Sequence, residues 1–185
     1  MKAAPARITL RLLGPLQIEH DGEPIRKIGS QKSLALLGYL VQQGQPISRT
    51  TLAGLLWPDQ AEAEARRNVR WALNNLTNLL PDSFVADRHT IHFQPGAQVW
   101  VDLLAFAAWQ GQNDEQALRT AADLYLGEFL AGLTVDDASE LELWLLQERE
   151  RWQSRALHLL ERLSQSYLDA SAYPQAESTL HRLLE

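Results

Sequence analysis

The stretch EARRNVRWALNNLTNLL, residues 64–80, has the apolar spacing of an amphipathic helix, and it also carries three arginines and four asparagines. At 100° per residue, its side chains fall on two stripes that lie about 160° apart. The apolar stripe holds Val69, Leu73, Leu76 and Leu80. The polar stripe holds Arg67, Trp71, Asn74 and Asn78, flanked by Arg66, Arg70 and Thr77 on one side and by Asn68 and Asn75 on the other. One face of the helix is therefore expected to pack against a core, and the other to face outward.

The chemistry of the outward stripe suits the major groove of DNA. Arginine donates paired hydrogen bonds to guanine O6 and N7 or grips a phosphate, and asparagine pairs with adenine N6 and N7. A solvated helix surface would also explain the charges and amides, because amphipathic helices with polar outer faces are common. The outward position of Trp71 favours the groove, since a large apolar ring in water usually has a partner.

The residues before this helix predict a small antiparallel sheet and two further helices. Residues 7–14 alternate apolar and polar side chains, as a strand does, and residues 16–29 contain a central Asp-Gly hairpin signal. Helical patterns cover residues 30–44 and 48–57. Each begins at a serine, a favoured N-cap, and the first ends at a glycine, a favoured residue just after a helix.

The residues after this helix predict a second hairpin. Residues 84–94 hold two β-rich runs with Arg88 and His89 at the tip, and residues 99–102 supply one more short strand. Strands, three helices and a hairpin in this order are typical of a winged helix, in which the two β parts would pair beside a three-helix core. We therefore expect an α+β winged helix-turn-helix domain over residues 1–101, with the hairpin tip near backbone phosphates.

The chain from residue 102 onward has an all-helical pattern. Helices are predicted over residues 102–110, 114–130 and 139–170, and a further one from Pro174. The last two resemble a tetratricopeptide-type helical hairpin. We expect a second, all-α tetratricopeptide-like domain over residues 102–185 and interpret it as truncated.

Charge and composition narrow the classes of function. Residues 1–100 carry 11 Lys/Arg and 8 Asp/Glu, whereas residues 101–185 carry 6 and 15, so the first part is the more compatible with a polyanion. The absence of cysteine excludes disulfides and thiolate metal sites. No signal peptide and no run of about 18 apolar residues occurs, so we expect a cytoplasmic protein that does not contact a membrane.

The sequence gives no sign of catalysis. The usual phosphate-loop, dinucleotide-binding and hydrolase motifs are absent. His89 and His92 would face opposite sides of a hairpin, so they do not form a metal pair. An acidic cluster at the start of the long helix, made of Asp136, Asp137, Glu140 and Glu142, is explained by stabilisation of that helix N-terminus. We expect neither catalytic residues nor a metal or other cofactor.

Six segments of the chain resemble one family of regulators. The first three are LRLLGPLQIEHDGEPI (10–25), QKSLALLGYLVQQGQPISRTTLAGLLWPD (31–59) and ARRNVRWALNNL (65–76). They are similar to the OmpR/PhoB-type winged helix of SARP-type bacterial transcriptional activators. The other three are VWVDLLAF (99–106), LYLGEFLAGL (124–133) and ELELWLLQERERW (140–152). They resemble the bacterial transcriptional activator domain that follows it.

The resemblance implies a sequence-specific DNA-binding activator that binds direct repeats of double-stranded DNA as a homodimer and contacts RNA polymerase. It places the recognition helix at residues 64–80 and a polymerase-contacting turn at residues 57–63. Many members have arginines where this chain has Asn75, Thr77 and Asn78, so we expect weaker and less salt-sensitive DNA binding than is usual for the family.

The candidate DNA-binding residues come from the second helix, the recognition helix and the wing. They are Ser48, Arg49, Arg66, Arg67, Arg70, Trp71, Asn74, Asn75, Asn78, Arg88 and His89. The rival hypothesis is a protein-interaction module whose winged helix no longer binds DNA.

Overall fold

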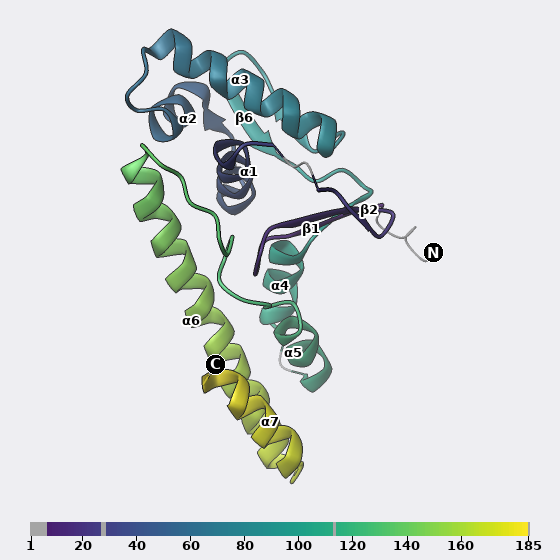
Figure 1. Cartoon of the computed structure of the whole chain (residues 1–185). Coiled ribbons are helices and arrows are strands. Elements are labelled where there is room, and N and C mark those ends of the chain that lie inside the picture. The colour runs from purple at the N-terminus through teal and green to yellow at the C-terminus, as the bar shows by residue number, and fades with distance from the viewer. Residues whose placement is uncertain (1–6, 27–28, 113, 185) are drawn as a thin grey trace.

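The computed structural model describes residues 7–26, 29–112 and 114–184. Three helices form the first helical group: α1 (Gln31–Gln43), α2 (Arg49–Leu56) and α3 (Glu62–Leu79). Four helices follow the second hairpin: α4 (Asp102–Gln110), α5 (Glu115–Ala122), α6 (Ser139–Asp169) and α7 (Tyr173–Leu184). Figure 1 shows α1, α2 and α3 gathered at one end of the molecule, with α6 running from them toward the opposite end.

The first three helices were predicted closely because their ends are set by local chemistry. Ser30 and Ser48 cap α1 and α2, and each hydroxyl oxygen accepts a hydrogen bond from a backbone N–H three residues on. Gly44 ends α1 in the left-handed region, at φ 59°. α3 begins two residues before the predicted start, where Glu62 and Glu64 place negative charge at the helix N-terminus.

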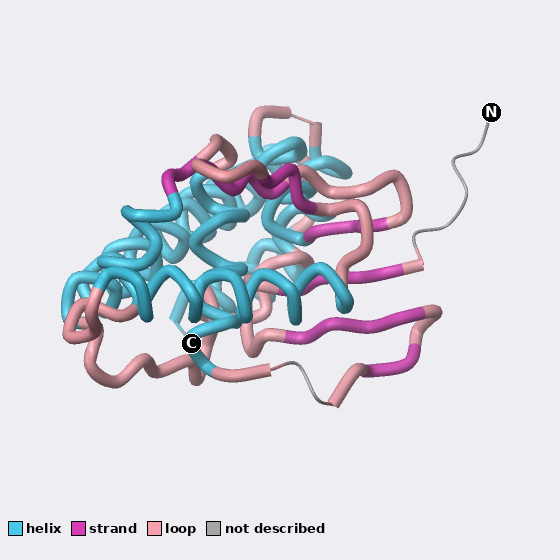
Figure 2. Tube along the Cα trace, turned by 90° about the horizontal axis from the view of Figure 1, so that it is seen from above, coloured by secondary structure: helices cyan, strands magenta, loops and turns pink. Residues whose placement is uncertain are grey.

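The N-terminal strands form one sheet with the order β3-β2-β1-β7. Its strands are β1 (Ile8–Arg11), β2 (Gln17–His20), β3 (Glu23–Pro24) and β7 (Val99–Val101). β1 and β2 pair antiparallel, as predicted, and β7 lies parallel to β1. The strands lie along an edge of the molecule beside the helices (Figure 2). Lys27 and Ile28, within the predicted hairpin, lie outside the described residues.

The second hairpin belongs to a different sheet, so the expected pairing of the two β parts was wrong. β5 (Phe84–Ala86) and β6 (Thr90–Phe93) pair antiparallel, and β6 also pairs with β4 (Ile47–Ser48) in the order β4-β6-β5. Ile47 lies opposite the buried Ile91 in this pairing. The short strand β4 therefore fixes the hairpin directly against the start of α2.

The helix predicted over residues 114–130 was also wrong, because α5 ends at Ala122. The segment that follows runs beside the end of β1 and the residues just after it. The N–H of Leu126 donates to the carbonyl of Leu13 at 2.9 Å, and the N–H of Leu130 donates to that of Leu12 at 2.8 Å. These backbone N–H groups are satisfied by the residues that follow β1 instead of by a helix, and Leu130 adopts φ 51°.

The helices α6 and α7 form the predicted helical hairpin. α6 is a single helix of 31 residues, and one apolar face of it packs into the core, with Trp144 only partly covered. Tyr167 on α6 and Ala176 on α7 are both buried. Among the described residues, no helix is long and apolar enough to cross a membrane.

The core continues across the change from mixed to all-helical structure. Asp102, the first residue of α4, is fully buried, and its carboxylate accepts hydrogen bonds from the N–H groups of Leu12, Leu13 and Leu103 at 2.6–2.9 Å. Burial raises the pKa of Asp102, and these hydrogen bonds act in the opposite direction. Glu148 of α6 accepts a hydrogen bond from Gln42 of α1 at 2.6 Å. Polar contacts as well as apolar packing therefore join the two parts.

Candidate nucleic-acid interface

The face of α3 that points to solvent is the one that the helical periodicity of the sequence predicted. The apolar stripe is buried, whereas the predicted polar stripe of Arg67, Trp71, Asn74 and Asn78 is exposed. The Trp71 side chain is 54% exposed, the largest apolar ring left in contact with solvent on this helix. α3 thus carries a guanidinium group, amides and an indole on a surface that is open to solvent.

Four arginines converge beside this face. They line a pocket of about 430 Å³ between the start of α2, the first half of α3 and the tip of the β5–β6 hairpin. The lining residues are Arg49, Arg66, Arg70, Asp87 and Arg88. Residues from three separate parts of the sequence therefore build one strongly basic hollow.

Arg49 is held in place by the hairpin tip. Its backbone N–H donates to the carbonyl of His89 at 2.8 Å, and its Nε donates to the carbonyl of Asp87 at 2.9 Å. Burial lowers the pKa of Arg49, and the charges of Arg70 and Arg66 lower it further while Asp87 opposes them. Like charges are thus crowded at this point, and an anion placed among them would relieve the repulsion.

Asp87 is the one acidic residue lining the pocket, and its carboxylate stabilises the hairpin turn through hydrogen bonds. Oδ1 accepts hydrogen bonds from the N–H groups of His89 and Thr90, both at 2.7 Å. These bonds lower the pKa of Asp87, so the carboxylate stays ionised and keeps the tip in shape. Within the described residues, neither Arg70 nor Arg88 has a hydrogen-bonding or ion-pair partner.

The pocket has the chemistry of a phosphate site. Guanidinium groups bind phosphate oxygens in a bidentate manner, and the N-terminus of α2, at Arg49, adds the positive end of a helix dipole. Arg66 lies 3.6 Å from Glu62, but this ion pair is exposed and contributes little. The same holds for Arg67, whose Nη2 lies 3.4 Å from Glu64.

The other predicted residues lie around the pocket. The Ser48 hydroxyl caps α2 and is also 2.7 Å from the hydroxyl of Thr51, so its hydrogen-bonding capacity is largely used within the helix turn. His89 is exposed at the hairpin tip but does not line the pocket. Asn75 is half-buried on the opposite flank of α3. The structure therefore brings the arginines together and leaves Ser48, His89 and Asn75 at the margins.

Trp71 has neighbours that the sequence did not reveal. It lines a second hollow, of about 420 Å³, together with Trp57, Lys32, Asp136 and Asp137. The two aspartates were assigned only to the start of the long helix, because no local signal predicts that their loop packs beside α3. No group of three or more His, Cys, Asp or Glu side chains in the described part of the chain is arranged to hold a metal ion.

No protein-family profile matches the chain. It is 27% identical over 184 residues to the regulatory protein AfsR of Streptomyces coelicolor, an alignment that covers 93% of this chain and 18% of AfsR. It is 31% identical over 90 residues to the transcriptional regulatory protein EmbR of Mycobacterium tuberculosis, covering 48% of this chain and 23% of EmbR. The chain thus spans about a fifth of the length of these relatives.

A solved structure of M. tuberculosis EmbR, in complex with a low affinity phosphopeptide, has the same fold. The TM-score is 0.62 at 20% identity, over 96% of this chain and 59% of the EmbR chain. This likeness confirms the predicted order of a winged helix followed by a tetratricopeptide-like helical domain. The similarity to AfsR and EmbR confirms the resemblance carried by the motifs: this chain is similar to the SARP-type bacterial regulators.

Proposed function

We propose that this chain is the DNA-binding part of a transcriptional activator, with α3 in the major groove of double-stranded DNA and the β5–β6 hairpin as the wing. The observation that carries the proposal is the four-arginine pocket between α3 and the wing tip, directly beside an exposed stripe of amides. A positive pocket next to a polar helix face is what simultaneous contact with phosphates and base edges requires.

The position of each residue on α3 indicates whether it contacts phosphates or bases. Arg66 and Arg70 lie on the flank that faces the wing, so they contact phosphates together with Arg49 and Arg88. Arg67 and Asn74 lie outside the pocket on the outward stripe. They are seven residues apart, or roughly 10 Å along the helix, which corresponds to about three base pairs. The outward stripe therefore reads bases, and the flank positions the protein.

The proposed partners follow from the relatives and the surface. A regulator role is consistent with AfsR and EmbR, which are named as regulatory proteins. The turn between α2 and α3 exposes Pro58, Asp59 and Gln60, and we propose this turn as the contact with RNA polymerase. Binding as a homodimer to direct repeats is part of the same proposal.

The test is DNA binding by the intact chain at several salt concentrations. Fluorescence anisotropy with duplexes from the upstream region of its own gene should show saturable binding. Arg70→Ala should weaken binding to every duplex and flatten the dependence of log K on log salt by about one unit, because one phosphate contact is lost.

The matched control is Arg119→Ala, since Arg119 is an exposed arginine on α5, far from the arginine pocket in sequence and not among its lining residues. It should leave both affinity and slope unchanged. If the intact chain binds no duplex, or if the two variants behave alike, the arginine pocket does not contact DNA. Either result would favour the hypothesis of a protein-interaction module.

A further inference from the structure

We propose that a cavity between the end of α5 and the helices α6 and α7 binds a small amphipathic molecule with an apolar body and one acidic group. The cavity has a volume of about 400 Å³, within the range of small-molecule sites in proteins. It lies in the helical part, away from the proposed DNA interface. The residues that matter for the argument are Tyr125, Leu126, Glu128, Gln153, Leu160 and Arg182.

The floor of the cavity is apolar. Ala156 and Leu160 of α6 are buried, and Leu157 beside them is partly covered. Leu126 at the opposite wall is 59% exposed, although its backbone is fixed to Leu13. A ligand with a ring or short chain between these walls would remove apolar surface from water on both sides.

The rim carries polar groups with unused hydrogen-bonding capacity. Among the described residues, neither the Tyr125 hydroxyl nor the Gln153 amide has a hydrogen-bond partner. Burial, followed by the charge of Glu128, raises the pKa of Tyr125, so the hydroxyl remains a donor at neutral pH. A few polar groups that converge on an apolar hollow are typical of a site that orients its ligand.

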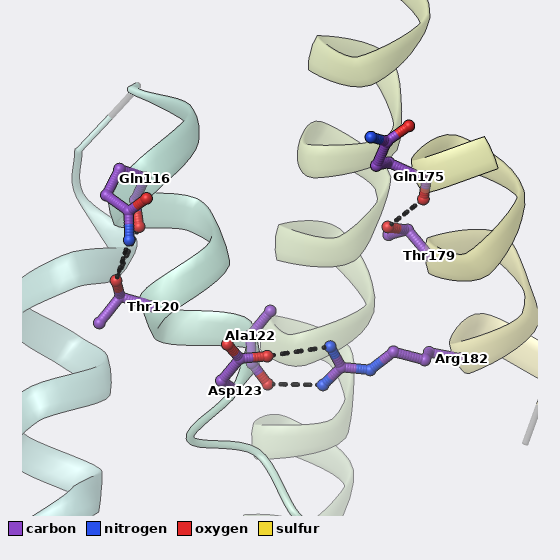
Figure 3. Close-up of polar contacts among 7 residues, drawn as sticks. All are labelled: Gln116, Thr120, Ala122, Asp123, Gln175, Thr179 and Arg182. Atoms are coloured by element: carbon purple, nitrogen blue, oxygen red, sulfur yellow. Dashed lines mark hydrogen bonds and ion pairs between the residues drawn. The ribbon is translucent and has the colours of Figure 1, made fainter. Parts of the chain in front are cut away.

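Arg182 supplies the positive charge, and the negative charge of Glu128 at the rim is partly balanced by Arg149, whose Nε lies 3.9 Å from its carboxylate. Arg182 reaches from α7 to the end of α5, where Nη2 donates to the carbonyl of Ala122 at 2.8 Å and Nη1 lies 3.3 Å from Asp123 (Figure 3). The bond to Ala122 fixes the guanidinium, which still has N–H groups to offer. The ion pair with Asp123 is largely exposed and therefore weak, so an acidic group on a ligand can compete with it.

The wall of the cavity is also the connection to the N-terminal sheet. The N–H of Gly14, just beyond β1, donates to the carbonyl of Glu128 at 3.1 Å, next to the Leu126 bond. A bound molecule would contact the segment that joins the helical part to the sheet. Binding should therefore raise the melting temperature of the whole chain.

The experiment titrates the intact chain with 8-anilinonaphthalene-1-sulfonate, a probe with two aromatic groups and one sulfonate. We expect saturable fluorescence with one molecule bound per chain. Arg182→Gln should weaken binding by at least about tenfold, the loss expected for a hydrogen bond between charged groups. Gln153→Trp, at an exposed position on α6, should block the cavity without disturbing the core.

Two controls separate this cavity from neighbouring surfaces. Arg182 also lines the adjacent hollow between α5, α6 and α7, and Arg119→Gln tests that hollow without changing the proposed cavity. Leu180→Ser tests the exposed apolar cluster of Leu168, Tyr173 and Leu180. Both should bind the probe as the parent chain does. The proposal is overturned if binding is not saturable, if either control weakens it as much as Arg182→Gln, or if Gln153→Trp binds normally while circular dichroism shows an intact fold.

Discussion

Asn74 and Arg70 lie one helical turn apart on α3 but face different parts of the proposed DNA. Arg70 lines the arginine pocket, whereas Asn74 is exposed outside it. We predict that Asn74→Ala lowers the preference for the cognate duplex over a scrambled one by about 1–3 kcal/mol, because a bidentate base contact is lost. The measurement compares the affinities for both duplexes at one salt concentration. If the variant binds both duplexes more weakly by the same factor, Asn74 does not contact bases.

Asp102 is a fully buried residue whose hydrogen bonds support the fold. Its carboxylate accepts hydrogen bonds from three backbone N–H groups, and no other acceptor serves those of Leu12 and Leu13 in the described chain. Each buried N–H left without an acceptor costs about 1–3 kcal/mol. Asp102→Ala should therefore lower the free energy of unfolding by at least about 3 kcal/mol in urea denaturation.

Asp114 provides the comparison for Asp102. It is an exposed aspartate that caps α5, accepting one hydrogen bond from the N–H of Ala117 at 2.9 Å. Asp114→Ala should cost only about 1 kcal/mol, the usual value for a lost N-cap. Similar losses in the two variants would show that Asp102 acts as an ordinary cap.

Two helical glycines differ in what surrounds them. A Cβ added at Gly38 of α1 would collide with the Cδ1 of Leu130, which is itself fully buried, whereas a Cβ at Gly54 of α2 would meet open space. Replacing glycine by alanine inside a helix stabilises the folded state by about 1 kcal/mol. Overpacking a core destabilises it by about 1–3 kcal/mol. Gly54→Ala should therefore stabilise the chain by up to about 1 kcal/mol, and Gly38→Ala should destabilise it by up to about 2 kcal/mol.

The thermal midpoints of the two glycine variants give the check. A rise in both would mean that Leu130 moves aside without loss. In that case the packing between α1 and the segment after α5 would be looser than the structure shows.

Elements with strong local signals were predicted well. α1 and α2 have serine caps and α3 and α6 have clear apolar stripes, so their existence and faces follow from the sequence. The two residues of β4 carry no pattern long enough to detect, and the helix expected after Ala122 gave way to pairing with the residues after β1. Long-range backbone pairing competes with local propensity and cannot be read from a short window.

The same distinction holds for the candidate site. The helical periodicity of the sequence distinguishes the buried face of α3 from the exposed face, because both faces lie on one helix. The meeting of Arg49, Arg66, Arg70 and Arg88 depends on where the hairpin packs, so the sequence named these residues without showing that they share a pocket. The aspartates beside Trp71 were missed for the same reason.

The whole molecule raises the question of whether its two parts fold independently. The expected boundary after residue 101 lies at the junction of β7 and α4. Yet Gln42 of α1 is hydrogen-bonded to two residues of α6: it donates to Glu148 and accepts from the Nε1–H of Trp152. Glu148 also accepts a hydrogen bond from Arg151 at 2.9 Å. Contacts of this kind give the winged helix a second source of stability beyond its own core.

A fragment of residues 1–101 tests the boundary. It keeps α1, α2, α3, both sheets and the apolar face of α3, so we predict a folded protein with a dispersed NMR spectrum. It lacks the Asp102 carboxylate and leaves the face of α1 that packs on Leu130 uncovered, so its midpoint in urea should lie below that of the full chain. A longer fragment, residues 1–133, restores both features and should recover part of the difference. A collapsed, poorly dispersed spectrum for residues 1–101 would instead mean that the helices after residue 101 are needed to complete a single shared core.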